Sequence, residues 1–198
     1  MNRKQRRANQ QAMACPSAKA GLAAKAGLAA KTSPAIGEGA PALFVSAVAQ
    51  HRLGRLAEAE RLYREALGRD PRHADSLQLL GTLLQQARRG DTAADLIRQA
   101  IALNPGNPGY HSNLGNVLRA RGEPDKAVAA YRRALALKPD FAEAHGNLGA
   151  ALKDQGEIEA AIASYRQTIA INPKLVDVHC NLGTALKDQD KLEEAEAC

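Results

Sequence analysis

The sequence contains no tryptophan, and only four tyrosines and two phenylalanines stand among its 198 residues. So few large rings argue against a single globular core, and we expect a core built from Leu, Ile and Ala between helices. No apolar run approaches the ~18–20 residues of a transmembrane helix, so we expect no membrane span. The basic start, MNRKQRR, is not followed by an apolar segment, which argues against a secretory signal.

Cysteine is also scarce. Cys15, Cys180 and Cys198 are odd in number, far apart and without paired spacing, which favours a reducing compartment. Together with the lack of a signal, this pattern predicts a cytoplasmic protein.

The common catalytic and cofactor-binding spacings are missing. The sequence has no HExxH, GxxxxGK(S/T), GxGxxG, CxxC or GxSxG, and each of these patterns brings together the groups that its chemistry needs. We therefore expect no catalytic residue, no cofactor and no metal in this chain, and do not expect it to be an enzyme by itself.

What the chain does have is an internal repeat with a 34-residue period. NLGNVLRARGEPDKAVAAYRRALALKP returns one period later as NLGAALKDQGEIEAAIASYRQTIAINP. Prolines and glycines recur at the same interval, at Pro71, Pro105, Pro139, Pro173, Gly81, Gly115, Gly149 and Gly183. A fixed period of this length indicates stacked units, each of which needs neighbours to bury its apolar faces.

Each unit has the pattern of two amphipathic helices. Apolar residues recur every three or four positions on both sides of a turn at Gly122-Glu123-Pro124. Gly115 and Ala127 are small enough to let two helices approach closely. Pro139 ends the second helix, because it lacks an N–H and its ring clashes one turn back.

This pattern resembles the tetratricopeptide repeat (TPR) family. In the third unit the resemblance rests on Leu114, Gly115, Ala127, Tyr131, Ala134 and Pro139. It implies an all-α solenoid of helix-turn-helix pairs, wound as a right-handed superhelix. The expected repeats span 40–73, 74–107, 108–141 and 142–175, with a partial repeat at 176–198, after a disordered, Ala/Lys-rich basic arm at 1–39.

The positive charge lies in this arm. Residues 1–31 hold seven bases, including Arg3, Lys4, Arg6 and Arg7, and no acid, whereas the other 20 of the 27 bases stand against 21 acids. We favour a solvated leader over an anchor for nucleic acid or anionic lipid, because a run of charge is a weak indicator. Nucleic acid is therefore not the expected partner.

The fifth unit stops inside its second helix. LEEAEAC supplies the start of that helix without the aromatic residue, the second Ala or the closing Pro. Because a helix this short is unstable alone, we expect the chain to be the front part of a longer array. The alternative is a natural end with the last helix as a cap, whose exposed edge would then serve for docking or self-association.

Asparagines form the most promising candidate binding site. Asn113, Asn147 and Asn181 recur at the 34-residue period, and Asn116 follows one turn after the first of them. In TPR solenoids the first helix of each pair lines the concave groove, where an amide offers both a donor and an acceptor to the main chain of an extended protein or peptide. The alternative is that Asn before Leu-Gly is an ordinary feature of such repeats.

Histidines recur at the same period, as His111, His145 and His179. Equivalent places in stacked repeats lie ~8–10 Å apart, too far for nitrogens that must converge at ~2.0–2.1 Å on zinc. We expect repeat-equivalent ring contacts near the helix interface instead.

Another use of TPR grooves, clamping a C-terminal carboxylate, needs cations beside the asparagines. Ser112, Gly146 and Cys180 stand there instead. Arg119, Lys153 and Lys187 form a basic row further along the first helices, offset by Asp154 and Asp188. The sequence therefore argues against a carboxylate clamp.

The sequences of the last two units, AEAHGNLGAALKDQG and VHCNLGTALKDQDKLEEAEAC, are similar to those of the superhelix repeats in O-linked N-acetylglucosamine transferases and SPINDLY-type proteins. Only the groove asparagines Asn113, Asn147 and Asn181 carry over, because the transfer domain of that group would lie beyond Cys198. We therefore expect a non-catalytic scaffold that binds an extended partner segment. The alternative is the substrate-recruiting front of a protein O-glycosyltransferase that uses a nucleotide sugar.

Overall fold

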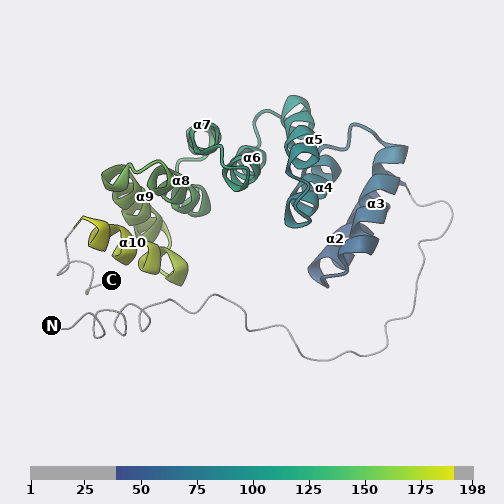
Figure 1. The fold of residues 1–198 in the computed structure, drawn as a ribbon. Helices are drawn as coiled ribbons and strands as arrows, with labels where there is room; N and C mark the ends of the chain where they lie inside the picture. Colours follow the sequence, from purple (N-terminus) through teal and green to yellow (C-terminus); the bar gives the residue numbers. More distant parts are fainter. Residues whose placement is uncertain (1–38, 190–198) are drawn as a thin grey trace. The chain divides into compact units, whose positions relative to one another are not determined.

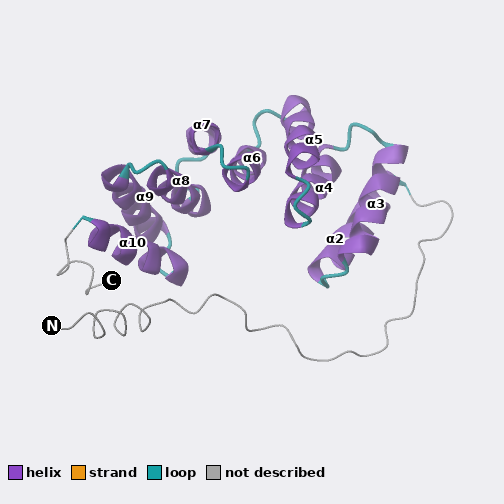
Figure 2. Ribbon diagram, in the orientation of Figure 1, coloured by secondary structure: helices purple, strands orange, loops and turns teal. Residues whose placement is uncertain are grey.

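The computed structural model describes residues 39–189, and within them every regular element is a helix (Figure 2). The basic arm ahead of Gly39, with Arg3, Lys4, Arg6 and Arg7, lies outside the described residues, as does the expected segment 190–198. In chain order the helices are α2 (Ala40–Arg52), α3 (Leu56–Arg69), α4 (Ala74–Gln86), α5 (Gly90–Leu103), α6 (Pro108–Ala120), α7 (Pro124–Leu137), α8 (Ala142–Asp154), α9 (Ile158–Ile171) and α10 (Val176–Asp188).

The helices alternate in two sets that keep the sequence period. The first helices of the pairs, α2, α4, α6, α8 and α10, each begin and end one period after the one before, and the second helices, α3, α5, α7 and α9, do the same. Residues one period apart therefore occupy equivalent places on successive helices. The expected all-α array of helix-turn-helix pairs is confirmed for this part of the chain.

Each first helix packs on its own second helix, which in turn packs on the first helix of the next pair (Figure 1). Successive first helices also touch from α4 to α10. The buried residues between them are mostly Leu and Ala, with Ile in a smaller share than expected. Three tyrosines, Tyr63, Tyr131 and Tyr165, are the largest fully buried side chains.

Two of these tyrosines pack against glycines of the facing helix. A Cβ atom on Gly115 would lie 2.5 Å from Cε1 of Tyr131, and one on Gly149 would lie 2.7 Å from Cε1 of Tyr165. Because real Cβ atoms do not approach a ring so closely, these positions exclude even alanine without movement of the ring. The recurrent Leu-Gly of the sequence is therefore what allows a phenol to fill the space between paired helices.

The turn between the two helices of each pair contains a residue in the left-handed backbone conformation. Gly54, Gly122 and Gly156 have φ of 72°, 74° and 82°, and Arg88 takes the same place in the second pair with φ of 59°. An L-residue in this conformation is strained by roughly 1–2 kcal/mol. The turn geometry is thus kept even where the sequence departs from glycine.

The histidine series connects each first helix to the loop before it. Nε2 of His111, His145 and His179 lies 3.0, 2.9 and 3.0 Å from the carbonyl oxygens of Pro105, Pro139 and Pro173, respectively. These contacts are repeat-equivalent, as expected, and no cluster of metal-ligating side chains occurs in residues 39–189.

Cys180 on α10 is disulfide-bonded. None of the described helices is long and apolar enough to cross a bilayer.

Candidate functional site

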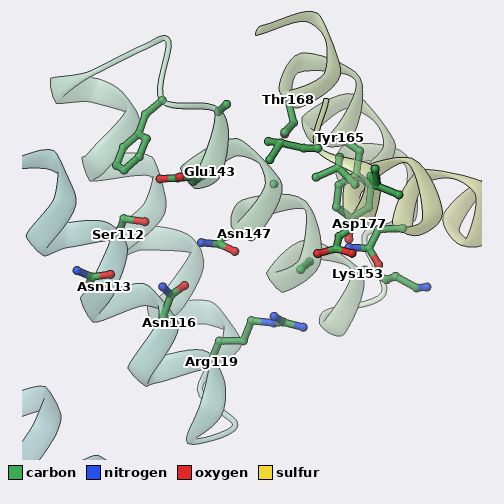
Figure 3. A pocket seen from close by; sticks show the side chains of 18 of the residues that line it. Ser112, Asn113, Asn116, Arg119, Glu143, Asn147, Lys153, Tyr165, Thr168 and Asp177 are labelled. Carbon is green, nitrogen blue, oxygen red and sulfur yellow. The ribbon is translucent and has the colours of Figure 1, made fainter. Parts of the chain in front are cut away.

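The predicted asparagines meet at one hollow. Asn113 and Asn116 on α6, Asn147 on α8 and Asn181 on α10 all line a cavity of about 950 Å³, which we call the amide groove. Figure 3 shows Asn113, Asn116 and Asn147 around this space. The three helices bring them together because they repeat the same residue register and pack side by side.

Three of the four amides have no hydrogen-bond partner among the described residues. Asn113 and Asn147 are half-buried and Asn181 is exposed, and their side chains make no hydrogen bond to any other residue between 39 and 189. Each amide can therefore offer its N–H donors and its carbonyl acceptor to a ligand.

Asn116 differs, because it already belongs to the fold. Its Oδ1 accepts a hydrogen bond of 2.8 Å from the Tyr131 hydroxyl, and its backbone oxygen accepts one of 3.3 Å from Nε2 of Gln85. Burial raises the pKa of Tyr131 far above its ordinary value, so this phenol stays protonated and keeps donating. The sequence placed Asn116 in the groove, but it did not reveal that its amide orients the buried tyrosine.

One edge of the amide groove is closed by ion pairs between neighbouring first helices. Nε of Arg119 lies 2.6 Å from Oδ2 of Asp154, and Nζ of Lys153 lies 3.4 Å from Oδ2 of Asp188. The basic row predicted from the sequence is therefore largely neutralised by the acids beside it. Since the side chains are partly exposed, each pair contributes at most about 1 kcal/mol, and its main effect here is to leave the edge without net charge.

The opposite edge carries two acids that sequence analysis did not single out. Glu143 and Asp177 stand one period apart in the first turns of α8 and α10 and line the same cavity. Acids are favourable at a helix N-terminus because of the helix dipole, and that role is enough to explain them. Their recurrence at the 34-residue period could have identified them from the sequence.

The arrangement is suited to binding. The cavity has a row of amides and an edge whose charged side chains pair with each other. It could hold the main chain of an extended polypeptide through amide hydrogen bonds.

Family models cover most of the chain. A model described as TPR repeat matches residues 115–156 and 149–190, and two models described as tetratricopeptide repeat match residues 50–117 and 22–74. No curated protein matches the sequence significantly.

Many solved structures have the same fold, and three are informative. MamA is 25% identical, with 76% of this chain and 88% of that chain covered and a TM-score of 0.68. The O-GlcNAc transferase of Thermobaculum terrenum is 33% identical over 66% of this chain but only 26% of that chain, with a TM-score of 0.64. YrrB, described as a TPR protein with an unusual peptide-binding site, is 22% identical, with 77% and 79% of the two chains covered and a TM-score of 0.62.

Proposed function

Because the chain belongs to the tetratricopeptide repeat family, we propose that its amide groove holds an extended segment of a partner protein. The observation that carries this proposal is the row of Asn113, Asn147 and Asn181, which have no partners in the described part of the chain and line one cavity. Arrays of this kind are scaffolds for protein interaction, and the groove is the surface where this scaffold would act.

The spacing of the row supports an extended ligand. Neighbouring helices pack ~8–10 Å apart, and an extended chain advances ~3.3 Å per residue. Successive asparagines could therefore reach the main chain about every third residue. Because amides would contact peptide groups, the row would accept segments of different sequence, and side chains would contribute selectivity elsewhere.

The charges argue against a carboxylate clamp. Arg119 and Lys153 are paired with Asp154 and Asp188, and Glu143 and Asp177 face the cavity from the other edge. Of the cations that line the cavity, Arg119 and Lys153 are already paired, and Lys174 lies in the loop before α10. An internal segment therefore suits the site better than a chain end.

A second candidate is recruitment of substrates for a protein O-glycosyltransferase. It is favoured by the 33% identity to part of the Thermobaculum terrenum O-GlcNAc transferase. Since the match spans only 26% of that enzyme, this proposal concerns the groove and assigns no catalytic residue here.

Two expectations from the sequence stay predictions. One is a cytoplasmic location, and the other is self-association through the C-terminal repeat. Fractionation of source cells and sedimentation at several protein concentrations would test them.

A crosslinking experiment tests the proposed groove. A photoreactive residue at Ala150, which lines the amide groove, is compared in source cells with one at Ala136, exposed on α7. We expect peptide crosslinks from position 150 that disappear in the Asn113→Ala/Asn147→Ala/Asn181→Ala variant, and none from position 136. Crosslinks that survive the triple substitution would contradict the proposal. Captured segments that carry an O-linked N-acetylhexosamine would favour the second candidate.

A further inference from the structure

The first helix that the structure describes, α2, is apolar on more than the face it buries. Leu43 and Ala47 are buried in the core, with 1% and 0% of their surface exposed. Phe44 and Val48 are only half-buried, and Val45 is 66% exposed. Neighbouring exposed apolar side chains often mark a surface that binds a partner, so the exposed side of α2 needs an explanation.

The repeat register places this side of α2 in line with the amide groove. Val45, Leu79, Asn113, Asn147 and Asn181 follow one another at 34-residue intervals on successive first helices, whose bounds shift by the same number. The row therefore changes from amides on α6, α8 and α10 to aliphatic side chains on α4 and α2.

On α2 the neighbouring positions are also apolar. Phe44 stands where later repeats have Gln78, Ser112 and Gly146, and Val48 stands where they have Thr82, Asn116 and Ala150, so this change is confined to α2. We call Phe44, Val45, Val48 and Leu79 the apolar extension. Its members are uncharged and lie on the same face of successive helices, which touch from α4 onward.

Three members of the apolar extension are held from beneath. Phe44, Val48 and Leu79 pack against the buried core. The Phe44 ring also lies tilted against the rings of Tyr63 and His73, with centroids 6.3 and 4.9 Å apart. These contacts fix the side chains in place while leaving part of each exposed, so a ligand would meet an ordered apolar surface.

We propose that the partner segment bound by the asparagines continues over α4 and α2 and places apolar side chains on the apolar extension. This inference rests on the proposed function. The argument for this occupant is continuity, because α4, which carries Leu79, touches α6, and the repeat register places Val45 of α2 next in the row. Neighbouring helices pack ~8–10 Å apart, and an extended chain advances ~3.3 Å per residue. The partner segment would therefore carry one apolar residue about three positions beyond the residue opposite Asn113, and another about six positions beyond it.

The test uses the full-length chain and a displayed library of random peptides of about fifteen residues, a length that extends past the whole row at ~3.3 Å per residue. Four proteins are compared: the unmodified chain, Val45→Ser, Leu79→Asn and the triple variant Asn113→Ala/Asn147→Ala/Asn181→Ala. Val45→Ser changes an exposed side chain and keeps the fold, which thermal unfolding verifies for each protein. The affinity of individual selected peptides is then measured.

We expect selected peptides to share aliphatic or aromatic residues about three positions apart at one end. Their binding should weaken about tenfold with Val45→Ser, the loss expected when one buried aliphatic contact is removed, and Leu79→Asn should select peptides that are polar at the corresponding position. Peptides that need the asparagines but show no apolar preference, and bind Val45→Ser equally well, would overturn this inference and leave the proposed function intact.

Two other outcomes also decide the matter. Binding that is independent of the asparagines would contradict the proposed function and this inference with it. Concentration-dependent dimers that Val45→Ser dissociates would show that a second copy covers the apolar extension, which would overturn the inference alone.

Discussion

The contact between Gly115 and Tyr131 makes a quantitative prediction about stability. A Cβ at position 115 would lie 2.5 Å from the ring, and Tyr131 is 0% exposed, so the ring has no open space to move into. Gly115→Ala should therefore strain the α6–α7 pair by about 1–3 kcal/mol, the usual cost of overpacking a core. Displacement of the ring would also break the bond to Asn116, a loss of about 0.5–1.5 kcal/mol.

Alanine also has a higher helix propensity than glycine, by about 1 kcal/mol, so a control is needed. Gly68→Ala lies in α3, where an added Cβ meets no atom within 4 Å. It should gain from propensity without strain. The difference in unfolding free energy between the two variants should then be about 1.5–4.5 kcal/mol, the sum of strain and the lost hydrogen bond.

Urea unfolding followed by circular dichroism measures the difference, and hydrogen exchange locates it. Because each repeat contacts only its neighbours, faster exchange in Gly115→Ala should begin in α6 and α7. Equal stability of the two alanine variants would refute the proposed role of this glycine in helix packing.

Other predictions concern the turns and the tyrosines. Arg88→Gly should raise the unfolding free energy by up to about 1 kcal/mol, because relief of left-handed strain exceeds the entropy cost of glycine. Gly122→Arg should lower the unfolding free energy. Thermal unfolding of both variants shows whether each change in stability has the expected direction. Burial raises the pKa of Tyr63 and Tyr165 to about 12. The unfolded chain therefore loses these protons first, near pH 10, so stability should be constant below that pH and decline between pH 10 and 12. Replacing both tyrosines with Phe should flatten this decline in alkaline titrations, and an unchanged decline would contradict the assignment.

The repeat period was enough to predict most of the fold. A strict interval fixes which residues share a helix face, so the all-α array and the close approach at glycine follow from spacing. Asn113 and Asn147 are half-buried beside one cavity, and their role in binding a partner stays a prediction.

Spacing does not determine which side chains bond to each other. The hydrogen bond between Tyr131 and Asn116 depends on how deeply the Tyr131 ring packs against Gly115. The spacing of residues in the sequence does not predict how deeply the ring packs. In the sequence, the left-handed turn at Arg88 is marked only by an arginine at a position where other repeats have glycine. The apolar character of Val45 and Leu79 at the asparagine position became clear once the helix bounds showed that α2 and α4 keep the same register.

The affinity of a crosslinked or selected peptide for the triple variant Asn113→Ala/Asn147→Ala/Asn181→Ala tests the central claim most directly. The matched control, Gln99→Ala/Gln167→Ala, removes amides from exposed positions on the second helices. If each asparagine bond to the main chain contributes a net ~0.5–1.5 kcal/mol, the triple variant should bind roughly 10- to 1000-fold more weakly, and the control should bind like the unmodified chain. An equal affinity for the triple variant and the control would contradict the account.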